Sequence, residues 1–220
     1  MTAYLFDLDG TLADSLPIIL QSSRLALKEL GREVSDEQII ALIGVPLIEA
    51  GDILLGEGQG ELYFKYYQKH FATMDMSDFA AFSGVDELLG RLKAAGGKLA
   101  CVTSKRRIAA EATLKQIGLL HYFPVQVCAE NTEYHKPHAE PALIALKALN
   151  ALEDTAVFIG DSIFDIGCAT NAGILSCGVT WGAGAEQELL EAGANYIAHT
   201  TSELAAILLA LLKPPIEGKK

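Results

Sequence analysis

From residue 82 onward, short apolar runs alternate with longer segments whose apolar residues recur at helical spacing. Strands that alternate with helices predict βα units, in which parallel strands form one sheet with helices on both faces. We therefore expect an α/β fold with a doubly wound, Rossmann-like parallel sheet. The predicted strands are 98–102, 125–128, 156–159 and 174–179, and the predicted helices are 84–95, 106–117, 139–149, 163–172 and 202–212.

A further apolar run at residues 4–6 precedes this alternating region, but no crossover helix of the usual kind follows it. Residues 15–80 instead show helical spacing and turn signals, with no strand pattern. We expect strand 4–6 to join the sheet and the helical block to be an insertion after it. The predicted division is a core of 1–14 and 82–220 with an inserted helical unit of 15–81, whose helices are 18–30, 35–44, 46–55 and 61–74.

The composition indicates a folded protein with a sizeable core, since 50% of the 220 residues are hydrophobic. The net charge of −11, from 17 basic and 28 acidic residues, argues against binding to nucleic acids or to anionic membranes. It does not exclude a small anionic substrate, because a bound cation can reverse the local charge.

Other features of the sequence indicate where in the cell the protein is located. The longest apolar run, 204–212, is too short to span a bilayer, and the first residues lack the features of a signal peptide. The four cysteines lack the spacing of a zinc site, which favours buried free thiols in a reducing compartment. We therefore expect a cytoplasmic protein, with a frayed tail at 213–220.

Two carboxylates, Asp7 and Asp9, directly follow the first predicted strand, and Gly10 then bends the chain. Ligands of open α/β sheets bind at the carboxyl ends of the strands. Two acids in that place are costly to bury alone, so we expect a cation or a proton with them. The alternative is an acidic turn without a function.

Each later strand also delivers polar residues to the same edge of the sheet. Taken singly, they have structural explanations, such as a helix cap, a first-turn acid or a solvated loop lysine. Together they suit phosphoryl transfer, which needs oxygen ligands for Mg²⁺, donors for the phosphoryl oxygens, a carboxylate that attacks phosphorus and another that moves protons. These residues are Thr103, Ser104, Lys136, Asp161 and Asp165.

Four stretches of the chain resemble the motifs of the haloacid dehalogenase superfamily. They are Asp7-Leu8-Asp9-Gly10-Thr11, Val102-Thr103-Ser104-Lys105, Lys136-Pro137 and Gly160-Asp161-Ser162-Ile163-Phe164-Asp165. The resemblance covers essentially the whole chain, and the inserted helical block resembles that family's type-one cap. Leu12-Ala13-Asp14-Ser15 and Ile43-Gly44-Val45-Pro46 are similar to the phosphoglycolate phosphatase-like branch, which includes pyrophosphatases and sugar-phosphate phosphatases.

This resemblance implies a role for each matching residue. Asp7 would be the nucleophile and Asp9 the general acid and base, while Thr103 would bind the phosphoryl group and Lys136 stabilise its charge. Gly10, Thr11 and Ser104 would also contact the phosphate. The implied Mg²⁺ ligands are Asp7, Asp161 and the backbone carbonyl of Asp9, with Asp165 orienting metal-bound water or Lys136.

The resemblance further implies a Mg²⁺-dependent phosphatase that forms an aspartyl phosphate. Its substrate would be a small phosphorylated metabolite, such as a phosphoglycolate-like compound, a sugar phosphate, a nucleotide or pyrophosphate. The second acid, Asp9, favours phosphate chemistry, because the dehalogenases of this family lack it. We expect no nucleic-acid or membrane partner, and a monomer or a homodimer.

The substrate's leaving group is less constrained by the sequence. The arginine that often stands just before the Ile43-Gly44 segment in phosphoglycolate phosphatases is missing here. Most of the nearby basic residues are expected on solvated helix faces, and His135 and His138 are expected to be simple loop residues. The candidates for contacts with an anionic leaving group are Arg24, Lys28, Lys65, Lys69, Lys105, Arg106 and Arg107.

Three other functions compete with hydrolysis. A phosphomutase would share the same core residues and differ only in contacts from the helical block. A phospho-accepting receiver domain uses similar residues, but its acidic pair precedes the hydroxyl and the lysine, whereas here an acidic pair also follows them. A catalytically silent binding protein is disfavoured, because every expected catalytic residue is present.

Overall fold

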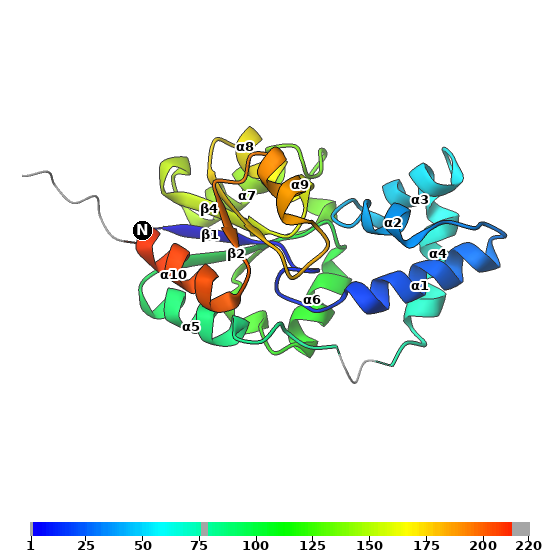
Figure 1. The fold of residues 1–220 in the computed structure, drawn as a ribbon, viewed down its shortest axis with the longest axis horizontal. Coiled ribbons are helices and arrows are strands. Elements are labelled where there is room, and N and C mark those ends of the chain that lie inside the picture. The colour runs from blue at the N-terminus through cyan, green and yellow to red at the C-terminus, as the bar shows by residue number, and fades with distance from the viewer. Residues whose placement is uncertain (1, 76–78, 213–220) are drawn as a thin grey trace, which may run out of the picture.

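The structure, a computed structural model, describes residues 2–75 and 79–212. Over these residues the chain forms one six-stranded parallel sheet in the order β3-β2-β1-β4-β5-β6 (Figure 1). The predicted doubly wound α/β fold is therefore confirmed. The strands are β1 (Ala3–Phe6), β2 (Lys98–Val102), β3 (Val125–Val127), β4 (Ala156–Gly160), β5 (Leu175–Val179) and β6 (Tyr196–Ala198).

Strand β1 lies in the middle of the sheet, between β2 and β4. Its Ala3 stands opposite Lys98 on one side and opposite Ala156 on the other. From β1 the chain adds β2 and then β3 on one side of the sheet. It then crosses back and adds β4, β5 and β6 on the other side. The strand order thus reverses between β1 and β4, and ligands of open α/β sheets bind at the carboxyl ends of the strands beside such a reversal.

Alternate residues of β1 pack into two separate hydrophobic cores, one on each face of the sheet. Tyr4 and Phe6 pack with the helices on one face, and Ala3 and Leu5 pack with those on the other. Each fully buried large side chain contributes about 1.5–3 kcal/mol, so β1 is fixed from both sides. The first face is covered by α5 (Val85–Ala94), α6 (Arg107–Gln116) and α10 (Thr201–Leu211), and the second by α7 (Glu140–Leu149) and α8 (Ile163–Asn171).

The helices between β1 and α5 form a group of their own, beyond the carboxyl end of β1 (Figure 1). They share a small core of Ala26, Leu27, Ile39, Tyr63 and Tyr67. This separate core supports the predicted division into 1–14 with 82–220 and an inserted 15–81, which stays a prediction. The helices are α1 (Leu16–Glu29), α2 (Asp36–Ile40), α3 (Leu47–Leu55) and α4 (Gly60–Phe71).

Residues 56–59 separate α3 from α4, where the sequence predicts a gap between helices 46–55 and 61–74. Gly60 begins α4, and a Cβ there would lie 2.1 Å from the Ile48 carbonyl oxygen, so glycine allows α3 and α4 to meet. The sequence prediction missed α9 (Glu186–Glu191) and β6, because elements of six and three residues carry too little periodicity. Within the described part of the chain, no helix has the length and apolarity needed to cross a membrane.

The cysteines are buried and free, as expected. Burial raises the pKa of Cys177 to about 12, which keeps this thiol protonated and unreactive. The tail 213–220, for which fraying is expected, lies outside the described residues.

Candidate active site

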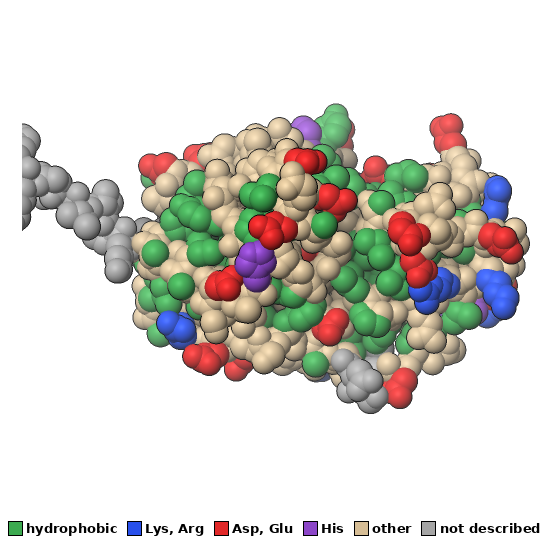
Figure 2. All heavy atoms as spheres, in the orientation of Figure 1, with side chains coloured by type: hydrophobic (Ala, Val, Ile, Leu, Met, Phe, Trp, Pro, Cys, Tyr) green, Lys and Arg blue, Asp and Glu red, His purple; other side chains and the backbone are tan. Residues whose placement is uncertain are grey.

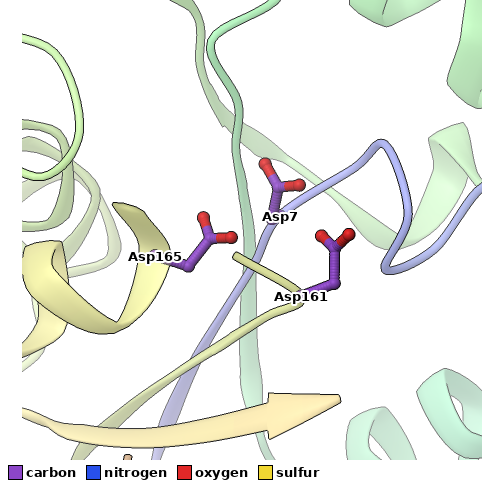
Figure 3. Close-up of side chains that lie close together, drawn as sticks. All are labelled: Asp7, Asp161 and Asp165. Carbon is purple, nitrogen blue, oxygen red and sulfur yellow. The ribbon is translucent and has the colours of Figure 1, made fainter. Parts of the chain in front are cut away.

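The candidate site lies at the carboxyl ends of β1 and β4. Asp7 follows β1 directly, and its backbone N–H donates to the carbonyl of Ile159 at 2.9 Å, which extends the strand pairing to the site. Asp161 follows β4, and Asp165 lies in the first turn of α8. Figure 3 shows the three carboxylates directed into one space, and one oxygen of each lies within 4.8 Å of the others.

Lys136 reaches into this acidic cluster from the loop before α7. Its Nζ donates to Asp7 Oδ1 and to Asp165 Oδ1, each at 2.6 Å, and its side chain is almost fully buried. Burial alone would lower the pKa of Lys136, but Asp165 and Asp7 raise it above its usual value. The ammonium is therefore charged and fixes both carboxylates in place.

The cluster still holds more acids than bases. Burial raises the pKa of Asp7 well above its usual value, with Lys136 opposing the shift and the other two acids adding to it. Burial, together with the charge of Asp165, raises the pKa of Asp161 to about 7. A divalent cation would relieve this excess of negative charge, and oxygen donors of this kind fit Mg²⁺.

Asp161 is held by backbone and side-chain donors on both sides. Thr11 Oγ1 donates to its Oδ1 at 3.0 Å, and the Ala183 N–H donates to its Oδ2 at 2.7 Å. Gly10 and Gly182 crowd the same carboxylate, since a Cβ at either would lie 2.1 or 2.2 Å from Asp161 Oδ2. The loop after β5 therefore helps to build the site, and the sequence prediction missed this loop because it carries no charged residue.

Asp165 combines a structural role with a role in the cluster. Its Oδ2 accepts from Ser162 Oγ at 2.6 Å in a capping box that begins α8, while its Oδ1 accepts from Lys136. The helix-cap explanation is thus confirmed for this residue, and its functional role stays a prediction. Gly160 leaves room for it, because a Cβ there would lie 2.3 Å from Asp165 Cγ.

The side chain of Asp9 lies apart from the acidic cluster. Its carboxylate accepts from Ser15 Oγ at 2.7 Å and from Lys105 Nζ at 2.6 and 2.7 Å, one distance to each oxygen. The carboxylate is partly exposed. The sequence named Lys105 among the candidate contacts, but gave no sign that it pairs with Asp9.

Thr103 and Ser104 follow β2 as predicted, and they differ in their contacts. Thr103 is buried, and its Oγ1 accepts from the Lys105 backbone N–H at 3.2 Å. Ser104 Oγ donates to the carbonyl of Gly44, which belongs to the helical block. His135 faces Thr132 in its own loop at 3.0 Å, in keeping with the simple loop histidine expected from the sequence.

The fold and these contacts define an α/β protein with a buried acidic cluster, a charged lysine and a second, separate carboxylate at one edge of the sheet. The model of the haloacid dehalogenase-like hydrolase family matches residues 4–179. The chain therefore belongs to the haloacid dehalogenase-like hydrolases.

Individual relatives agree with this assignment along most of their length. The pyrophosphatase PpaX of Bacillus velezensis is 31% identical over 212 residues, covering 94% of this chain and 96% of the relative. The phosphoglycolate phosphatase of Colwellia psychrerythraea is 31% identical over 215 residues, covering 91% and 93%. A solved haloacid dehalogenase-like family hydrolase from Streptococcus pneumoniae is 29% identical with a TM-score of 0.82, covering 94% of this chain and 98% of that one.

Proposed function

We propose that this hydrolase is a Mg²⁺-dependent phosphatase that acts on a small phosphorylated metabolite through an aspartyl-phosphate intermediate. The observation that carries the proposal is the position of Asp7, buried at the end of β1 and paired with Lys136 at 2.6 Å within the acidic cluster. A carboxylate held in this way is oriented for attack, and its lysine neighbour can stabilise a transferred phosphoryl group.

In this proposal Asp7, Asp161 and the backbone carbonyl of Asp9 would hold Mg²⁺. When bound, Mg²⁺ would neutralise charge on the phosphoryl oxygens and on the carboxylates around them. Asp165 would act through Lys136, since it already accepts a hydrogen bond from that ammonium. The residues that would contact the phosphoryl group are Thr103, Lys136 and Ser104, with backbone groups of Gly10 and Thr11.

Asp7 and Asp9 divide the chemistry between them. An oxygen of Asp7 forms a bond to phosphorus while the bond from phosphorus to the leaving oxygen breaks, and Asp9 gives its proton to that oxygen. Asp9 then accepts a proton from a water molecule, whose oxygen attacks phosphorus and releases Asp7. The separation of Asp9 from the acidic cluster supports this division, because its carboxylate is free of the partners that hold Asp7.

The substrate stays a class rather than one compound. The names of the relatives refer to two different substrates, pyrophosphate and phosphoglycolate, and both are small and anionic. We propose a soluble metabolite of this kind, with no nucleic acid or membrane as partner, and a cytoplasmic monomer or homodimer.

A panel of phosphorylated metabolites tests the proposal, with phosphate release measured in the presence of Mg²⁺ and then of a chelator. We expect release from at least one compound, loss of activity with the chelator and recovery when Mg²⁺ is restored. Asp7→Asn should abolish turnover while the protein stays folded. Full activity in that variant would remove Asp7 as the nucleophile.

The same panel separates a hydrolase from a phosphomutase. A hexose 1-phosphate is added, and the sugar product is analysed. Free sugar and phosphate are expected, whereas an isomerised sugar phosphate would replace the phosphatase proposal with a mutase.

A further inference from the structure

Lys105 is a half-buried cation whose contacts are only partly accounted for by the proposed chemistry. An ammonium has three N–H donors, and Lys105 Nζ uses two of them on the two oxygens of Asp9, at 2.6 and 2.7 Å. Among the residues that the structure describes, Nζ has no acceptor besides these two oxygens. One donor of a partly desolvated ammonium is therefore left for another acceptor.

The helical block lies close to this ammonium. Ser15, directly before α1, donates from its Oγ to Asp9 Oδ1 at 2.7 Å. The next basic residue, Arg106, lies over the ring of Phe64 in α4 at 5.5 Å. Ser104, on the other side, bonds to the carbonyl of Gly44. Lys105 is thus placed between the sheet edge and the helices above it.

A leaving group bound during the proposed reaction must reach the same place. Asp9 has to contact the leaving oxygen in order to protonate it, and Lys105 lies one hydrogen bond from both Asp9 oxygens. The free donor of Lys105 is consequently within reach of atoms attached to the leaving oxygen. An ammonium in this position favours a negative charge there, because partly buried charges are weakly screened.

The other candidate cations are already paired or exposed. Arg24 pairs with Asp36 and Lys69 with Glu29 on the surface of the helical block, and Arg106 pairs with Glu130 at 3.0 Å. Lys136 is used by Asp7 and Asp165. In Figure 2 the basic side chains seen on the helical block gather toward its far end. Lys105 is therefore the candidate with both a suitable position and a free donor.

We propose that Lys105 binds the leaving group of the substrate, and that this leaving group carries a second negative charge, as a carboxylate or a second phosphate. This inference rests on the proposed function, because that function places the leaving oxygen beside Asp9. It goes further by naming the substrate class and the residue that selects it. Neutral sugar phosphates would be poor substrates in comparison.

Two nearly isosteric compounds test the inference. Phosphoglycolate carries a carboxylate on its leaving group, and 2-hydroxyethyl phosphate has a neutral hydroxyl in its place. The ratio of kcat/KM for the two is measured for the wild type, Lys105→Met and Lys105→Arg. Lys115→Met serves as the control, because Lys115 is an exposed lysine of α6 and its removal makes the same change in net charge.

We expect the wild type and Lys115→Met to prefer phosphoglycolate. Lys105→Met should lose about tenfold or more of this preference, the value of one hydrogen bond to a charged group, and Lys105→Arg should retain part of it. An equal fall for both compounds would overturn the inference, because Lys105 would then act only by holding Asp9. A kcat/KM that stays unchanged for both compounds would overturn the inference as well.

A binding measurement separates this inference from the proposed function. Calorimetry is carried out with Asp7→Asn, which cannot turn over the compounds, with and without Lys105→Met. We expect Asp7→Asn to bind phosphoglycolate more tightly than 2-hydroxyethyl phosphate, and this difference to disappear when Lys105→Met is added. That result supports the anion contact even if no phosphate is released. Absence of turnover by the wild type would overturn the phosphatase proposal, and absence of a Lys105-dependent preference would overturn this one.

Discussion

Lys136 is the residue on which the acidic cluster depends for its geometry. It donates to Asp7 and to Asp165 in surroundings that exclude water almost completely. Replacing such a group leaves two carboxylates buried without their common partner. A protein can tolerate the paired state more easily than the broken one, because desolvation of an unpaired charge is expensive.

Lys136→Met should therefore lower the free energy of unfolding by about 3–5 kcal/mol at pH 8, the usual cost of breaking a buried ion pair. Denaturant unfolding measures this change, and Lys115→Met is the matched control with no expected loss. Asp7→Asn should be at least as stable as the wild type, since it removes one charge from a cluster with too many acids. A stable Lys136→Met variant would mean that the ion pairs contribute little.

Asp161 makes the stability of the metal-free protein depend on pH. Its pKa is raised from 3.8 to about 7 in the folded state, so between these values the folded protein holds a proton that the unfolded chain has released. The contribution of Asp161 to stability should then fall by a few kcal/mol as pH rises through this window and level off above it. Thermal unfolding with a chelator measures the fall, and Asp161→Asn should reduce it. A wild-type profile as flat as that of the variant would contradict the shift.

The loop after β5 shows how an element without charged residues can build a charged site. It supplies the Ala183 N–H to Asp161 Oδ2, and the Gly184 N–H donates to the Asp161 carbonyl at 2.8 Å. Trp181 anchors the same loop, since its Nε1 donates to the Thr11 carbonyl at 3.2 Å. The loop after β5 and the turn after β1 thus both donate hydrogen bonds to Asp161.

Gly182→Ala should weaken Mg²⁺ activation, because its Cβ would lie 2.2 Å from Asp161 Oδ2 and must displace either the carboxylate or the loop. We expect the Mg²⁺ concentration for half-maximal activity to rise about tenfold or more, in line with the usual effect of disturbing groups around metal ligands. Gly90→Ala is the control, since its Cβ would lie 3.4 Å from Tyr122 Oη and alanine favours a helix. Equal metal dependence in both variants would exclude the steric argument.

The elements that the sequence predicted well are those with long, periodic apolar patterns. The central strand and the four predicted strands after residue 82 were placed correctly, while β6 was missed, and the edge of the sheet that brings Asp7, Lys136 and Asp161 together was placed correctly too. The pairing of Asp9 with Lys105 was not predictable, because it depends on side-chain directions at the ends of two different strands. The loop 180–185 was missed for a similar reason, since its contribution comes from backbone N–H groups that any residue carries.

At the scale of the whole molecule, the helical block and the sheet are joined by two neighbouring connections. The Asp14 N–H donates to the Ala80 carbonyl, and the Phe82 N–H donates to the Leu12 carbonyl, both at 3.0 Å. Gly44 touches the sheet side elsewhere, where a Cβ would lie 2.9 Å from Ser162 Oγ. The block therefore meets the sheet side through backbone hydrogen bonds at its two connections and through contacts of Gly44.

The central place of β1 also has a consequence for the order in which the protein can be assembled. This strand leaves the ribosome before the rest of the sheet, but Ala3 has its partners at Lys98 and Ala156. Until the second of these has been synthesised, Asp7 lacks the neighbouring carboxylates of Asp161 and Asp165, and contacts between such distant residues form slowly. The nascent chain must therefore keep its first strand unpaired on one side for most of its synthesis, and the proposed nucleophile, which is made early, has its surroundings completed late.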